Sequence, residues 1–239
     1  MKERLFKFKQ FEVAHYDSPM KVGVDAVLLG AWADTSNVKS CLDVGTGCGV
    51  IALCVAQRTT DTIITGIDID LPSVNEAASN FSKSPWKDRL CARPLSFDEI
   101  MNESIKFDLV ISNPPYFDSG VTPGTNSRLI ARHIDSLSPF HLIKKANNIL
   151  TPAGRLSMIV PAEQKELLLE LAKLHGLAIR RMLLVRGSKR KIPKRVLLEF
   201  DLNKEIGAAE PYETLTIHEE DQSYSEEYKK LTGDYYLNF

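Results

Sequence analysis

Long apolar runs are missing from this sequence of 239 residues. No stretch approaches the roughly 20 apolar residues that a helix needs to cross a bilayer, so we expect no membrane segment. The charged opening segment Met1–Arg4 leads into alternating residues and not into an apolar stretch. We therefore expect no signal peptide and a cytoplasmic location.

Cysteine is also scarce. The four cysteines, Cys41, Cys48, Cys54 and Cys91, form no C-x-x-C pair, and no histidine cluster accompanies them. This spacing argues against a zinc site, and we expect no metal. We expect all four thiols to be reduced and to be buried as small apolar side chains.

Neither sign of charge dominates the whole chain, which has 30 Lys and Arg against 31 Asp and Glu. The distribution is uneven, because residues 180–195 contain eight Lys or Arg and no acid, whereas acids dominate residues 199–227. Local clusters steer a polyanion more strongly than net charge does, so the basic run is a candidate nucleic-acid contact. A solvated loop is the alternative interpretation.

Short apolar runs alternate with helical patterns along the chain, which is typical of βαβ units and a parallel sheet. We expect strands at residues 41–44, 62–68, 89–95, 107–112, 155–160, 177–185 and 196–202. We expect helices at residues 25–32, 50–57, 72–82, 139–150 and 162–175. The pattern predicts one Rossmann-like α/β domain with seven strands, a mostly parallel sheet and helices on both of its faces.

The first of these strands ends in a glycine-rich loop, Gly45-Thr46-Gly47-Cys48-Gly49, and a helix follows. Glycines let the backbone approach a ligand closely, and the first turn of the helix offers free N–H groups. The spacing differs from the dinucleotide pattern G-x-G-x-x-G. Asp43 precedes the loop, where it would repel a pyrophosphate but would suit a ligand with an ammonium group.

Asp68 ends the second strand, where a carboxylate can accept hydrogen bonds from both ribose hydroxyls. Asp70 lies nearby but is expected to cap the helix that begins near Pro72. A tight turn alone would account for the glycines but not for both acids. Together these features favour S-adenosylmethionine over NAD as the cofactor.

The tetrad Asn113-Pro114-Pro115-Tyr116 directly follows the fourth strand. Ligands of open α/β sheets bind beyond the carboxyl ends of the strands, so the tetrad should lie beside the glycine loop. The Asn113 amide oxygen and the Pro114 carbonyl can accept both hydrogens of a planar amino group, and prolines hold that carbonyl rigidly. Tyr116 offers a face for a flipped base.

Positioning of this kind, together with acceptors for the developing positive charge, suits methyl transfer to an amino or amide nitrogen of a planar, conjugated group, such as the exocyclic N6 of adenine. A proline-rich turn without chemistry is the alternative.

With these motifs, the chain resembles the bacterial tRNA (adenine-N6)-methyltransferases that modify the purine 3′ to the anticodon of a valine tRNA. The matching segments are residues 8–11, 20–23, 28–32, 45–49, 84–86, 113–116 and 221–225. The resemblance implies the seven-stranded class I methyltransferase fold. It also implies one domain over residues 1–239, with residues 1–38 as an N-terminal extension that covers the cofactor and residues 39–239 as the Rossmann-like core.

The resemblance further implies where the ligands bind. The implied cofactor residues are Asp25, Asp43, Gly45, Gly47, Gly49, Asp68 and Ser96. The implied residues for the target adenine are Asn113, Pro114, Pro115 and Tyr116. The chain departs from the family pattern twice: Val24 replaces a threonine, and Ser96 replaces an acid beside the cofactor adenine, where Asp98 is an alternative.

The implied partner is the anticodon arm of a tRNA, with a monomer as the default state. The expected RNA contacts are Arg128, Arg132, Arg186, Lys189, Arg190, Lys191, Lys194 and Arg195. The late aromatic residues Tyr224, Tyr228, Tyr235, Tyr236 and Phe239 are expected to dock the final helix as core residues.

Other enzymes and proteins remain alternatives. Release-factor glutamine N5-methyltransferases share the tetrad but carry a helical domain before the glycine loop, and only about forty residues precede it here. DNA adenine methyltransferases need a separate recognition domain, and ribosomal guanine-N2 enzymes have Phe in place of Tyr116. A nicotinamide-dependent oxidoreductase and a non-catalytic RNA-binding module also remain open.

Overall fold

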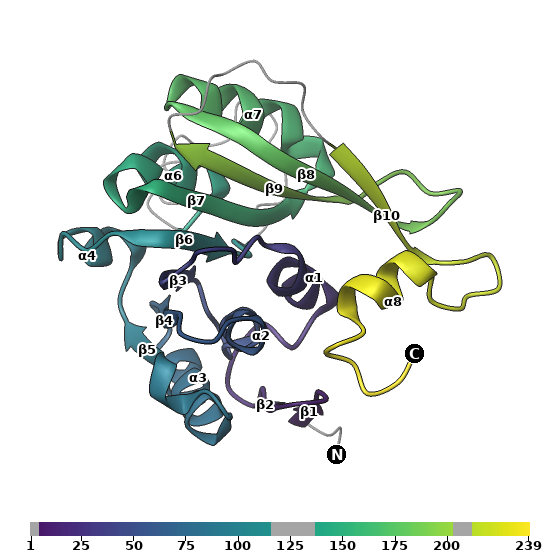
Figure 1. The fold of residues 1–239 in the computed structure, drawn as a ribbon, viewed down its shortest axis with the longest axis horizontal. Helices are drawn as coiled ribbons and strands as arrows, with labels where there is room; N and C mark the ends of the chain where they lie inside the picture. The colour runs from purple at the N-terminus through teal and green to yellow at the C-terminus, as the bar shows by residue number, and fades with distance from the viewer. Residues whose placement is uncertain (1–4, 116–136, 203–211) are drawn as a thin grey trace, which may run out of the picture.

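A computed structural model describes residues 5–115, 137–202 and 212–239. Within these residues, one mostly parallel sheet has eight strands in the order β10-β8-β9-β7-β6-β3-β4-β5 (Figure 1). Its strands are β3 (Ser40–Val44), β4 (Ile63–Asp68), β5 (Leu90–Pro94), β6 (Phe107–Ser112), β7 (Leu150–Pro161), β8 (Leu177–Ser188), β9 (Arg195–Leu202) and β10 (Tyr212–His218). Only β9 runs antiparallel to its neighbours.

Helices cover both faces of the sheet. The α-helices are α1 (Val24–Trp32), α2 (Val50–Arg58), α3 (Leu71–Lys83), α4 (Phe97–Met101), α6 (Pro139–Lys145), α7 (Lys165–Leu174) and α8 (Glu226–Thr232). Short 3₁₀ turns are η1 (Lys87–Arg89), η2 (Ala146–Asn148) and η3 (Ala162–Gln164). Figure 1 shows α6 and α7 on one side of the sheet and α1, α2 and α8 on the other.

Each face of the sheet has its own apolar core. Successive strand residues point to opposite faces, so Leu109 and Ile111 of β6 join the core beneath α1 and α2, and Val110 joins the core beneath α6 and α7. Apolar side chains on both faces explain why the strands read as continuous apolar runs. The predicted Rossmann-like fold class is confirmed.

A two-stranded hairpin, β1 (Leu5–Lys7) and β2 (Glu12–Ala14), precedes the main domain. Phe8 forms a β-bridge with Tyr236, and the Lys9 amide donates to the Tyr235 carbonyl at 2.8 Å. Tyr228 and Tyr235 are buried, as expected of residues that dock the final helix. Tyr224 and Phe239 stay 38% and 44% exposed, so the core interpretation is wrong for these two.

Two further expectations need correction. An eighth strand, β10, pairs with β8, so the sheet in the described residues has eight strands and not the expected seven. Arg180 and Arg181 of the basic run belong to β8, within the strand expected at residues 177–185, and pair with Asp34 and Glu199. Cys91 is exposed on the edge strand β5, where only one sheet neighbour covers it.

The helix expected at residues 139–150 is also shorter than predicted. It ends at Lys145, and the chain passes through η2 into β7, because the apolar residues that follow are the start of a buried strand. Tyr116, Arg128 and Arg132 lie outside the described residues. None of the helices in the described ranges is long and apolar enough to cross a membrane.

Candidate active site

The glycine loop joins β3 to α2 in a backbone conformation that favours glycine. Gly45, Gly47 and Gly49 have φ angles of 71°, 54° and 87°, in the left-handed region. A Cβ atom on Gly45 would lie 2.8 Å from Leu137 Cδ2. The amides of Gly45 and Thr46 both donate to the Ile67 carbonyl at 2.9 Å, which ties the loop to β4.

Asp43 lies fully buried beneath this loop. Its Oδ2 atom accepts hydrogen bonds from Thr46 Oγ1 at 2.7 Å and from the Ala52 amide at 3.2 Å. Its Oδ1 atom is buried and has no hydrogen-bond partner among the described residues. Burial raises the pKa of Asp43 to about 7. A cationic ligand at the loop would favour the ionised form, so this carboxyl group fits a sulfonium cofactor.

Asp68 shapes the loop from the neighbouring strand. Its Oδ2 atom accepts from the Gly47 amide and its Oδ1 atom accepts from the Asp70 amide, both at 3.0 Å. Asp70 itself accepts from the Ser73 amide at the start of α3, so its predicted role as a helix cap is confirmed. These bonds hold the Asp68 carboxylate in the wall of a cavity.

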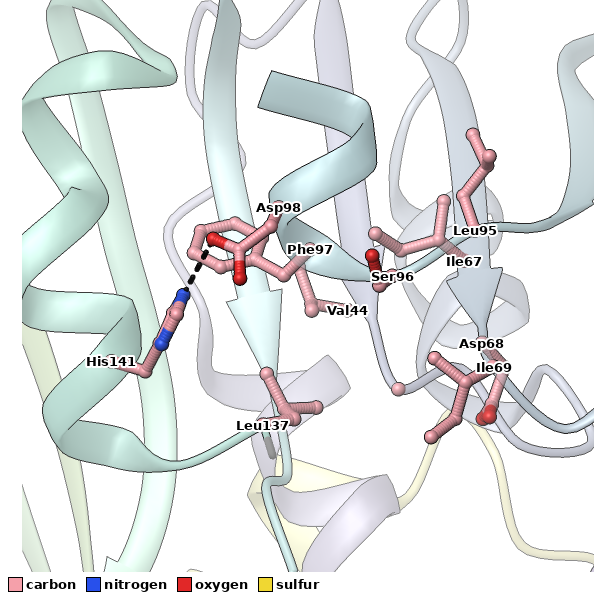
Figure 2. A pocket seen from close by; sticks show the side chains of 11 residues that line it. Val44, Ile67, Asp68, Ile69, Leu95, Ser96, Phe97, Asp98, Leu137 and His141 are labelled. Atoms are coloured by element: carbon pink, nitrogen blue, oxygen red, sulfur yellow. Dashed lines mark hydrogen bonds and ion pairs between the residues drawn. The ribbon is translucent and has the colours of Figure 1, made fainter. Parts of the chain in front are cut away.

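This first cavity has a volume of about 90 Å³ and mainly apolar walls (Figure 2). Its lining residues are Val44, Gly45, Ile67, Asp68, Ile69, Leu95, Ser96, Phe97, Asp98, Leu137 and His141. Narrow apolar walls with a few polar groups are typical of a pocket for a flat, partly polar ring.

Ser96 and Asp98 lie in this first cavity but have different partners. The Ser96 hydroxyl donates to Glu99 Oε2 at 2.7 Å and accepts from the Glu99 amide at 3.2 Å, which forms a capping box at the start of α4. Asp98 Oδ1 lies 2.9 Å from His141 Nε2 (Figure 2). A carboxylate only accepts, so the imidazole donates here. No described residue donates to Asp98 Oδ2.

A second cavity of about 250 Å³ lies on the other side of Gly45, which is a wall of both. Its lining residues are Met20, Lys21, Gly23, Val24, Asp25, Ala26, Gly45, Thr46, Gly47, Cys48, Val50, Ile51 and Asn113. The structure thus brings the glycine loop, the start of α1 and the first residue of the tetrad together at one site, as the sequence predicted.

Strand pairing places Asn113 at the second cavity. The preceding residue, Ser112, ends β6 and donates from its hydroxyl to the Val44 carbonyl at 2.8 Å. Since Val44 is the last residue before the glycine loop, this bond fixes the tetrad beside it. Pro114 is buried and Pro115 is exposed.

Two residues of α3 that the sequence did not single out hold the N-terminal segment against the site. Asn80 donates to the carbonyls of Ala14 at 2.9 Å and Cys48 at 2.8 Å, and accepts from the Ala14 amide at 2.9 Å. Glu76 accepts from the backbone amides of residues 16–18. A helical pattern gives no signal for such contacts, because both partners lie far away in the sequence.

The predicted RNA contacts are divided between two places. Arg195 pairs with Asp25 at the second cavity, with 2.9 Å between Nε and Oδ2. At the turn between β8 and β9, Lys189 pairs with Glu219 at 3.0 Å and Arg190 pairs with Glu220 at 2.9 Å. The other members within the described residues are Arg186, which donates to Thr216 Oγ1 at 3.0 Å, and the exposed Lys191 and Lys194.

The family model for the methyltransferase small domain matches residues 22–174. A tRNA1(Val) (adenine(37)-N6)-methyltransferase from Parabacteroides distasonis is 41% identical over 234 residues, which cover 97% of each chain. A protein of the same name from Vibrio vulnificus is 39% identical over 239 residues, which cover 99% of this chain and 97% of the relative. The chain belongs to the tRNA1(Val) (adenine(37)-N6)-methyltransferase family.

The tRNA1(Val) (adenine(37)-N6)-methyltransferase family is therefore the one that the sequence motifs indicated, and its cofactor is S-adenosylmethionine. Among solved structures, a predicted O-methyltransferase from Agrobacterium tumefaciens has a TM-score of 0.63 at 18% identity, covering 88% of this chain and 96% of that chain. A ribosomal protein L11 methylase from Lactobacillus delbrueckii has a TM-score of 0.53 at 16% identity, with 75% and 77% covered. These likenesses show the class I methyltransferase fold.

Proposed function

We propose that the protein transfers the methyl group of S-adenosylmethionine to N6 of adenine 37 in the anticodon arm of a valine tRNA. The observation that carries the proposal is the shared cavity of Asn113 and the glycine loop. The Asn113 side chain, which can accept from an amino group, lies there beside a loop suited to a nucleotide, and this supports the proposal. The relatives named for this reaction, which match almost the whole chain, support the choice of substrate.

The two cavities divide the cofactor between them in this proposal. The first cavity takes the adenosine part, with the ribose hydroxyls on Asp68 and the adenine between apolar walls. The second cavity takes the methionine part beside Gly45, Gly47 and Asp25. Asp43 supports the loop through Thr46 and Ala52 and places negative charge behind it.

The target adenine enters the second cavity at Asn113. When bound, S-adenosylmethionine would supply an electrophilic methyl group and leave as S-adenosylhomocysteine, and the methylated amine would release one proton to solvent. The Asn113 amide oxygen and the Pro114 carbonyl accept the two hydrogens of the adenine amine, which aims its nitrogen and stabilises the positive charge that develops on it. Pro115 limits the backbone freedom of the tetrad. Tyr116, outside the described residues, is proposed to stack on the base.

Asn113→Ala tests this assignment. We expect methyl transfer to fall by roughly a hundredfold or more, as for other groups that stabilise charge in the transition state, with cofactor and tRNA binding retained. The matched control is Asn147→Ala, because Asn147 is exposed and its side chain donates to the His175 carbonyl, away from both cavities. The assay incubates labelled cofactor with total tRNA from a strain that lacks the enzyme and identifies the methylated nucleoside by mass spectrometry.

Unchanged transfer by Asn113→Ala would overturn the catalytic role of Asn113. A product other than N6-methyladenosine would overturn the proposed reaction, and a product at another tRNA position would overturn the anticodon-arm assignment. We further propose that the enzyme is cytoplasmic and acts as a monomer. Light scattering on the same preparation tests the monomeric state.

A further inference from the structure

A third cavity, of about 330 Å³, lies beside the C-terminal helix and is lined mainly by aromatic rings. Phe6 comes from β1, Tyr228 comes from α8, and Tyr224, Tyr236 and Phe239 come from the segments on either side of α8. Neither the fold nor the methyl transfer described above uses this cavity.

Some of the aromatic rings that line this cavity are buried in the core, and others are exposed to solvent. Tyr228 is only 2% exposed and supports Tyr224, with a centroid distance of 5.2 Å and an angle of 22° between the rings. Phe239 stands edge-on to Tyr224 at 5.5 Å. Tyr224 and Phe239 both keep more than a third of their surface exposed. Exposed aromatic rings on a fixed support are typical of a binding surface.

The third cavity adjoins the proposed reaction site. Gly23 and Val24 line both it and the second cavity, so only the start of α1 separates them. Exposed apolar side chains lie here, since Val24 of the shared wall is 42% exposed and Met20 of the second cavity is 50% exposed. A ligand that fills the second cavity therefore lies directly beside the third cavity.

The basic turn lies on the opposite side of Tyr224. The Tyr224 ring stacks on His218 at 4.9 Å, and His218 pairs with Ser188 at the end of β8. Lys189 and Arg190 follow Ser188 directly. The aromatic rings thus lie between a cationic turn and the site of methyl transfer.

We infer that the third cavity binds a second nucleobase of the RNA substrate, from a nucleotide that adjoins the target adenine. This inference rests on the proposed function. Bases have apolar faces that pack on aromatic side chains without regard to sequence, and their phosphates require cations nearby. Asn238 offers a polar partner for the edge of the base.

Photo-crosslinking tests the inference directly. The probe is an RNA hairpin with the sequence of the anticodon arm, carrying 5-iodouridine at one loop position at a time, with the full chain and S-adenosylhomocysteine. We expect a nucleotide next to the target adenine to crosslink to Tyr224 or Phe239, as mapped by mass spectrometry. Crosslinks that map only elsewhere would overturn the inference.

Kinetics of substituted proteins provide a second readout. We expect Phe239→Ala to raise KM for tRNA roughly tenfold, the loss typical of one stacked base, with KM for the cofactor unchanged. Tyr224→Ala should raise KM for tRNA as well, because it removes the ring against which Phe239 stands. Tyr224→Phe should retain the wild-type KM. The matched control is Tyr212→Ala, because Tyr212 is 65% exposed on β10 and lines none of the three cavities. Thermal melting identifies any variant that fails to fold.

The outcomes separate the two proposals. If the wild-type protein methylates tRNA but neither ring crosslinks and both alanine variants keep the wild-type KM, the second base site is wrong and the proposed function stands. If tRNA is not methylated but Tyr224 still crosslinks, the proposed function fails and the base site stands. The absence of both methylation and crosslinks overturns both.

Discussion

Ser96 and Asp98 are neighbours in the first cavity, but their hydrogen bonds assign them different roles. The Ser96 hydroxyl both donates to and accepts from Glu99, whereas Asp98 is oriented by His141 and has an oxygen available to a ligand. We therefore expect Asp98→Ala to weaken binding of S-adenosylhomocysteine by about tenfold or more, since a hydrogen bond to a charged group contributes roughly 1.5–3 kcal/mol.

The matched variant is Ser96→Ala. It should leave that binding unchanged and lower stability by about 1 kcal/mol through loss of the helix cap. Calorimetric titration and denaturant unfolding measure the two quantities. If Ser96→Ala weakens binding and Asp98→Ala does not, the assignment is reversed.

At the scale of single residues, the sequence predicted those residues whose position follows from the residues adjacent to them in the chain. Gly45, Gly47 and Asn113 follow directly from strand ends, so their position was readable. His141 was not, because the contact to Asp98 spans 43 residues of sequence. Asp25 was predicted at the cofactor, but its ion pair with Arg195 joins two elements 170 residues apart, which no local pattern encodes.

Helix α3 links the N-terminal segment to the glycine loop, and Asn80 is the residue that contacts both. Asn80→Ala would leave the Ala14 and Cys48 backbone groups without their partner, at a cost of about 1–3 kcal/mol for a buried polar group. We expect faster amide exchange at residues 14–18 and a raised KM for the cofactor, because Met20 and Lys21 of the second cavity follow this segment.

The control for this prediction is Asn75→Ala, an exposed position on the same helix. Amide exchange by mass spectrometry and cofactor titration check the two effects. Wild-type exchange and KM in Asn80→Ala would show that the N-terminal segment is held by other contacts.

At the scale of elements, strands buried on both faces were predicted closely, since their apolar runs are continuous. The expected strand at residues 107–112 coincides with β6 (Phe107–Ser112). Strand β10 was missed because its first three residues are exposed and its pattern lacks such a run. It forms through pairing with β8, which a local pattern does not reveal.

For the whole molecule, a net charge of −1 gives no general attraction for RNA, so binding depends on where the cations lie. Lys189 and Arg190 at the turn after β8 are paired with Glu219 and Glu220, but both pairs are solvent-exposed. Exposed pairs are weak and screened by salt, so a phosphate can replace the acid. We therefore expect the acidic segment to weaken, without abolishing, the attraction of the basic turn for RNA.

Replacing Lys189, Arg190 and Lys191 together by Glu should weaken tRNA binding and reduce the slope of log K against log salt by about 2, given roughly 0.7–0.9 per phosphate contact. In the control triple, Glu replaces three lysines that are exposed and line none of the three cavities, Lys83, Lys144 and Lys173. It changes the net charge equally, so an equal loss of binding would show that the total charge and not the turn attracts the RNA. Fluorescence anisotropy with labelled tRNA at several salt concentrations measures both slopes.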